Sequence, residues 1–126
     1  MSRLFLLAAG GGIGTMLRYG LSVFADRAAG GVFPAGTLAV NLGGSLLIGC
    51  FWGLFERGAL TPEVRLFLMT GVLGGFTTFS TFALENISLM RDGGFKLAAA
   101  NILISNIAGL FLVFAGFKAV GLMARP

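Results

Sequence analysis

The chain has 126 residues, of which 56% are hydrophobic and 11% are charged, and it contains no histidine. Soluble domains carry roughly 25% charged residues, so this composition indicates an integral membrane protein. The absence of histidine excludes His-containing triads and His metal sites, and the single Cys50 excludes an intrachain disulfide and a cysteine metal cluster. We therefore do not expect an enzyme. The net charge of +4 comes from scattered Lys and Arg, which favours helix ends anchored at lipid headgroups over nucleic-acid binding.

Uncharged windows between the charged residues predict four transmembrane helices in a single domain, residues 1–126. The expected spans are 4–25, 33–55, 64–90 and 95–120. Thr61 and Pro62 suit the N-cap and the first position of the third helix. All connecting loops are short, so consecutive helices are expected to pack antiparallel.

Positive charges are distributed almost evenly between the two ends of the predicted bundle. One end carries Arg3, Arg57, Arg65, Lys118 and Arg125, and the other carries Arg27, Arg91 and Lys96. Five charges against three give only a weak bias under the positive-inside rule, and two interpretations stay open. The chain inserts in both orientations and forms an antiparallel homodimer, or it is an ordinary membrane protein with both termini in the cytoplasm.

Polar side chains recur at four-residue intervals in the second and fourth spans, so each set lies on one face of an otherwise apolar helix. The sets are Thr37, Asn41 and Ser45 in the second span, and Asn101 and Ser105 in the fourth, where Gly109 continues the same spacing. A single stripe of this kind is most simply explained by hydrogen bonds between membrane helices. Two stripes beside a third polar segment favour a lined pathway.

That third segment runs from Gly71 to Glu85 in the third span. Gly74-Gly75 followed by Thr77-Thr78 disfavours a continuous helix and predicts a break near the middle of the membrane. Unwound backbone at this depth must be buried in protein or line a cavity, where its carbonyl or amide groups can bind an ion. The alternative is a kinked helix in which glycine only permits close packing.

Phenylalanine recurs every three residues through this segment, at Phe76, Phe79 and Phe82. The edge of an aromatic ring carries the positive end of its quadrupole, so ring edges beside hydroxyl groups can face an anion without trapping it. No acidic residue lies deep in any predicted span, which favours a passive channel over a proton-coupled transporter. Arg18, the one basic residue within a span, can snorkel to the interface or concentrate anions in a vestibule.

The chain resembles the Fluc (CrcB) family of microbial fluoride channels over essentially its whole length. The resemblance rests on Arg18-Tyr19, on residues 37–45, and on residues 71–82 with Glu85. It implies a fluoride-selective channel in the bacterial inner membrane that passively exports cytoplasmic fluoride and relieves its toxicity. It also implies a dual-topology homodimer, assembled antiparallel, with two pores. The partners would be a second copy of the chain, fluoride and the lipid bilayer.

The resemblance further implies roles for individual residues. Phe79 and Phe82 would meet fluoride with their ring edges, and Asn41 would donate its side-chain amide to the ion. The backbone carbonyls of Gly74 and Thr77 would hold a structural Na⁺ on the dimer axis. The remaining residues would form a hydroxyl track (Ser80, Thr81 and Ser105) and the pore mouths (Arg18 and Glu85).

The fourth span departs from the family pattern, because Asn101 stands where several members carry tyrosine, and Gly109 and Val113 stand where some carry hydroxyls. Either the entrance is built differently or the alignment shifts there. Two other classes also fit a chain of this size. A small multidrug exporter needs an acidic residue in its first span, whereas the first acid here, Asp26, is expected in a loop. A non-transporting membrane assembly subunit would use both polar stripes only as contacts between helices.

Overall fold

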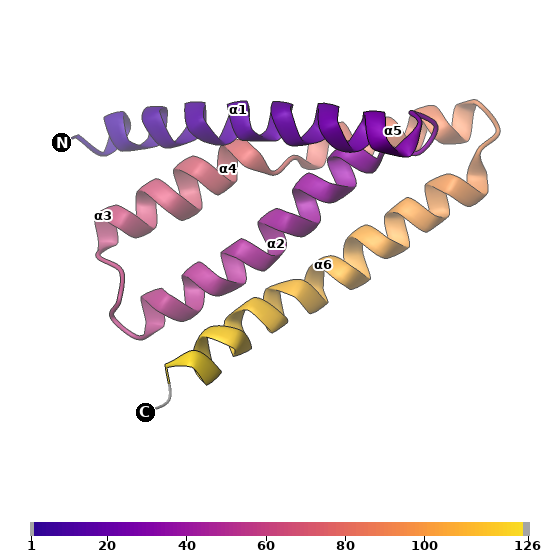
Figure 1. The fold of residues 1–126 in the computed structure, drawn as a ribbon. Coiled ribbons are helices and arrows are strands. Elements are labelled where there is room, and N and C mark those ends of the chain that lie inside the picture. The colour runs from indigo at the N-terminus through magenta and orange to yellow at the C-terminus, as the bar shows by residue number, and fades with distance from the viewer. Residues whose placement is uncertain (1, 125–126) are drawn as a thin grey trace.

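A computed structural model describes residues 2–124, so Arg125, one of the positive charges counted above, lies outside the described residues. The described chain is all helical (Figure 1). Its elements are α1 (Arg3–Ala29), α2 (Ala35–Glu56), α3 (Pro62–Arg65), the π-helix η1 (Leu66–Val72), α4 (Leu73–Phe76), α5 (Phe79–Arg91) and α6 (Phe95–Met123). Elements α3 to α5 together form the third long segment, and all four long segments are apolar enough to cross a membrane. The predicted all-helical architecture with four candidate spans is confirmed.

The helix ends follow from local capping chemistry. As predicted, the Thr61 hydroxyl caps α3 by accepting a hydrogen bond from the Val64 N–H, and Pro62 is the first helical residue. The expected loop beginning at Asp26 is wrong, because α1 continues to Ala29 and ends only where Gly30 adopts a left-handed φ of 79°. Asp26 is therefore helical.

Two pairs of helical segments pack backbone to backbone through glycine. Along one side of the fold, α1 lies against η1 and α4, and along the other, α2 lies against α6 (Figure 1). A Cβ atom on Gly14 would overlap the carbonyl oxygen of Val72, and one on Gly49 would overlap the carbonyl oxygen of Val113. Small residues at such contacts let membrane helices approach closely enough for extensive van der Waals packing.

A small buried cluster of Val40, Leu73 and Phe76 joins α2 to α4 in the middle of the fold. Many other large apolar side chains face outward; Leu110, for example, is 75% exposed. This distribution is expected where the surrounding solvent is lipid. The buried cluster fixes the place at which α2 meets the third segment.

The third segment leaves helical geometry between α4 and α5. Thr77 and Thr78 are both extended, with φ and ψ of −83° and 158° and of −151° and 121°. Gly74 and Gly75 lie within α4, so the extended residues are the two threonines. The Thr77 hydroxyl bonds back to the Leu73 carbonyl at 2.8 Å, and the Thr78 hydroxyl accepts the Thr81 N–H at 3.3 Å and so begins α5. Both threonine hydroxyls therefore satisfy backbone groups at the ends of the helices they flank.

Candidate functional site

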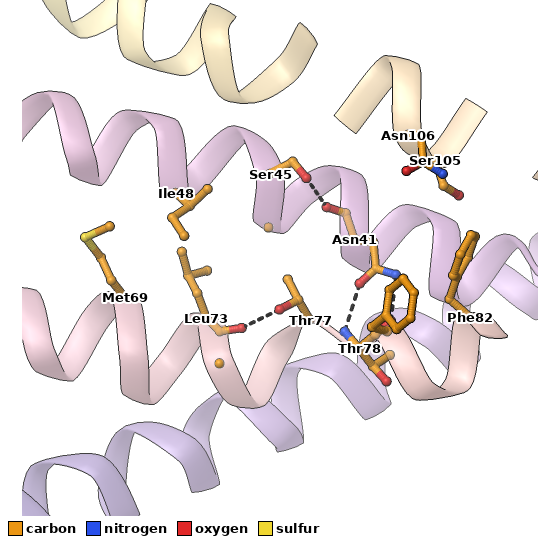
Figure 2. Close-up of a pocket in the computed structure, with 13 residues that line it drawn as sticks. Asn41, Ser45, Ile48, Met69, Leu73, Thr77, Thr78, Phe82, Ser105 and Asn106 are labelled. Atoms are coloured by element: carbon orange, nitrogen blue, oxygen red, sulfur yellow. Dashed lines mark hydrogen bonds between the residues drawn. The ribbon is translucent and has the colours of Figure 1, made fainter. Parts of the chain in front are cut away.

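A cavity of about 430 Å³ lies where α2, the third segment and α6 meet (Figure 2). Among the described residues, none of those lining it carries a charged side chain. They are Asn41, Gly44, Ser45, Ile48, Met69, Leu73, Gly74, Thr77, Thr78, Phe79, Phe82, Ser105 and Asn106. The wall therefore offers amides, hydroxyls, aromatic rings and backbone groups to a ligand.

The Asn41 side chain clamps the extended backbone at Thr78. Asn41 Nδ2 donates to the Thr78 carbonyl at 2.9 Å, and Asn41 Oδ1 accepts from the Thr78 N–H at 2.9 Å (Figure 2). The amide thus satisfies both polar groups of one non-helical peptide residue, as a neighbouring strand would. Gly44 permits the approach, because a Cβ atom there would overlap Thr77 Cγ2.

The phenylalanines that recur every three residues are divided by the extended residues. Phe79 and Phe82, on α5, line the cavity with ring centroids 5.6 Å apart and ring planes tilted by 46°. Phe79 is 79% exposed. Phe76, on α4, is buried against Gly43 and Gly44 and belongs to the core cluster. Only two of the three rings therefore reach the site.

A second polar connection joins α5 to α6. Asn86 Nδ2 donates to the Phe82 carbonyl, and Asn101 Nδ2 donates to Asn86 Oδ1 at 3.1 Å. Ser105 Oγ, which lines the cavity, lies 3.4 Å from Asn101 Oδ1. Asn86 and Asn101 are only 4% and 1% exposed. Asn86 was not among the residues selected from the sequence, although its four-residue distance from Phe82 was a visible signal.

The carboxyl group of Glu85 lies apart from the cavity and is bonded to α2. Thr37 Oγ1 donates to Glu85 Oε1 at 2.7 Å, while Glu85 Oε2 is buried with no hydrogen-bond partner among the described residues. Near the start of α2, the side chain of Asp26, which lies on α1, accepts the Gly36 N–H at 2.7 Å. Asp26 therefore caps α2, which accounts for an acidic residue at the end of α1.

The cavity brings together only some of the residues selected from the sequence. Asn41, Phe79, Phe82, Ser105, Gly74 and Thr77 line it. Ser80 and Thr81 are exposed on α5, and Thr81 bonds to Thr78 instead. Arg18 lies on α1 and, like Glu85, does not line the cavity. The parts assigned to all these residues in conduction remain predictions.

Comparison of the sequence with known proteins shows the family of the chain. Residues 5–117 match the family model described as "CrcB-like protein, Camphor Resistance (CrcB)". A relative from Parabacteroides distasonis, named fluoride-specific ion channel FluC, is 49% identical over 92% of this chain and 91% of its own. Proteins of the same name from Agrobacterium fabrum and Thermus thermophilus are 50% and 46% identical. These two alignments cover 92% and 96% of this chain and 94% and 97% of the relatives.

Proposed function

The chain belongs to the CrcB-like protein family, and from this premise we propose that it is a fluoride-specific ion channel of the bacterial inner membrane. It is a multi-pass membrane protein with four apolar helical segments. Its activity is the passive export of cytoplasmic fluoride, which reduces fluoride toxicity. The observation that carries the proposal is an uncharged cavity lined by amides, hydroxyls and two phenylalanine rings, in a chain about half identical to proteins named for this activity.

An uncharged wall suits rapid passage of a small anion. A conducting site must replace part of the hydration shell and still release the ion, and a fixed cationic side chain would hold fluoride too firmly. The rings of Phe79 and Phe82 can present their positive edges, and Ser105 can present a hydroxyl hydrogen. We assign fluoride coordination to these groups together with Asn41.

Asn41 can clamp the backbone and donate to the ion at the same time. A side-chain amide carries two N–H hydrogens, and one of those on Asn41 bonds to the Thr78 carbonyl. The second hydrogen has no partner among the described residues and is available to an anion in the cavity. The clamp also restricts the rotation of the amide, so this donor is oriented before the ion arrives.

We further propose an antiparallel, dual-topology homodimer with two pores. The nearly even charge of the two ends removes a strong preference for one orientation. Gly74 and Thr77 also leave polar backbone at a surface that a membrane protein must cover, because Gly74 is exposed and Thr77 is only half-buried.

The carbonyl oxygens of Gly74 and Thr77 fit a structural Na⁺ at this surface. Within residues 2–124 no hydrogen bond reaches either oxygen. In a continuous helix the Thr78 N–H would bond Gly74 and the Thr81 N–H would bond Thr77, but these donors are taken by the Asn41 side chain and the Thr78 hydroxyl. Free carbonyls of unwound membrane helices are suitable Na⁺ ligands. Two copies of the chain would supply four such oxygens, and the bound ion would hold the two interrupted segments together. Replacing Na⁺ with a large organic cation should therefore weaken pairing.

Fluoride efflux from liposomes containing the purified chain tests the proposed function. A fluoride electrode should record rapid release, and a chloride electrode should record none from matched chloride-loaded vesicles. No fluoride release from protein that is helical and monodisperse would contradict the channel and favour a non-transporting assembly subunit.

A further inference from the structure

Two serines in the cavity follow an asparagine by four residues, yet their hydroxyls have different partners. Ser45 Oγ bonds back to the main-chain carbonyl of Asn41 at 2.8 Å, a strong contact within its own helix (Figure 2). Ser105 Oγ instead lies 3.4 Å from the side-chain oxygen of Asn101. An O–H···O hydrogen bond is usually 2.5–3.0 Å long, so the Ser105 hydrogen is held weakly.

The direction of the amides behind Ser105 is fixed by a main-chain carbonyl. The Phe82 carbonyl can only accept, so Asn86 must turn its NH₂ group toward it at 2.8 Å. The oxygen of Asn86 then faces Asn101, which must in turn donate its NH₂ group. Reversing either amide would bring two oxygens or two NH₂ groups together in a buried place and leave polar groups there without a hydrogen-bond partner.

We propose that Asn86 and Asn101 are a positioning pair that keeps the Ser105 hydroxyl available to the permeating anion. When no ion is present, the Ser105 hydroxyl bonds weakly to the side-chain oxygen of Asn101. When fluoride arrives, the hydroxyl donates to the ion instead, because fluoride is the stronger acceptor. Without the pair, Ser105 would bond to the main-chain carbonyl of residue 101, as Ser45 does at the equivalent position. This inference rests on the proposed function and assigns the pair no contact with the ion.

A double-mutant cycle in fluoride efflux tests the coupling. We expect Ser105→Ala and Asn101→Leu each to lower efflux about tenfold, the effect of losing one hydrogen bond to the passing ion. The combined variant should be no slower than either single one. Asn86→Ser shortens the side chain that accepts from Asn101 and leaves Asn101 itself in place. It should reduce the effect of Ser105→Ala in the same way, and it provides the test if Asn101→Leu does not fold.

Ser45→Ala is the matched control, because Ser45 has the same spacing and lines the same cavity but lies outside this network. It should change efflux by the same factor with Asn101 present or replaced. Multiplicative effects of Ser105→Ala and Asn101→Leu, or no effect of Ser105→Ala in an otherwise unchanged chain, would overturn the positioning role. Failure of the unchanged chain to release fluoride would instead contradict the proposed function itself.

Discussion

The clamp between Asn41 and Thr78 predicts a severe effect for Asn41→Asp. The aspartate keeps an oxygen for the Thr78 N–H but replaces Nδ2, 2.9 Å from the Thr78 carbonyl, with a second oxygen. Two acceptors then face each other where one hydrogen bond was made. The same change removes the second N–H of Asn41, which is free to donate into the cavity, and puts a negative charge on the cavity wall.

The two consequences can be estimated separately. Loss of the hydrogen bond with an unsatisfied carbonyl costs about 1–3 kcal/mol. A carboxylate ~4 Å from an anion adds about 4 kcal/mol of repulsion at an effective dielectric constant of ~20. Because each 1.36 kcal/mol in a barrier is tenfold in rate, the charge alone should slow fluoride about a thousandfold. Asn41→Ala removes the clamp without adding charge and should slow it only about tenfold.

Efflux from liposomes, normalised to the amount of helical, monodisperse protein, provides the comparison. Asn106→Asp is the control for charge, because Asn106 lines the cavity but bonds only to the Ile102 carbonyl of its own helix at 2.7 Å. We expect it to slow fluoride less than Asn41→Asp does. Full efflux from Asn41→Asp would refute both the anion path beside Asn41 and the reasoning from the clamp.

Three further substitutions separate conduction from folding. Phe79→Ile and Phe82→Ile should each lower fluoride efflux and change the midpoint of thermal unfolding little, since both rings line the cavity outside the buried core. Unchanged efflux in both variants would exclude the rings from the mechanism. Thr77→Val should alter efflux by less than about twofold, because the Thr77 hydroxyl bonds only to Leu73 and the role assigned to this residue belongs to its backbone carbonyl. A larger loss of efflux would implicate the hydroxyl in conduction. Gly49→Ala should destabilise the protein by about 1–3 kcal/mol in thermal unfolding, because the new Cβ atom would overlap the Val113 carbonyl. Gly12→Ala is the neutral control, because a Cβ atom at residue 12 meets nothing within 4 Å.

The four spans were predictable because hydropathy and the spacing of charges act along the chain. The end of α1 was less predictable from the sequence, because two consecutive charged residues, Asp26 and Arg27, suggest a loop. Their helical state depends on Gly30 as the first left-handed residue and on the bond from Gly36 to Asp26. That bond pairs two helices, and no local pattern indicates it.

The sequence predicted several residues that line the site, but it did not predict which side chains bond to one another. Asn41, Phe79, Phe82 and Ser105 follow from helical spacing and the family resemblance, and they line one cavity. Asn86 was missed because its partner, Asn101, lies on the next helix, α6, and the hydrogen bond between them is visible only in the structure. The spacing of Phe76 also implied a ring on the same face as the other two. The extended residues after it interrupt the helix, so Phe76 ends α4 and packs in the core, whereas Phe79 and Phe82 lie on α5.

The proposed pairing of two chains makes its sharpest prediction at Gly74. This residue is exposed, and a Cβ added to it meets nothing within 4 Å in the single chain. Within α4, Gly74→Ala should therefore stabilise an isolated chain by up to about 1 kcal/mol, because alanine is the better helix former. If a second copy packs against the free carbonyls of Gly74 and Thr77, the new methyl group must instead separate the two copies.

Subunit association in detergent micelles, measured over a range of protein concentrations by chemical cross-linking, distinguishes these outcomes. We expect Gly74→Ala to shift association to higher concentration, and Gly20→Ala, at an equally open position on α1, to leave it unchanged. The reason is that unsatisfied carbonyls inside a membrane cost several kcal/mol each, so the surface carrying them is the one a partner must cover. Unchanged association of Gly74→Ala, together with greater thermal stability, would place the contact between copies elsewhere and remove the basis for a shared Na⁺ at this position.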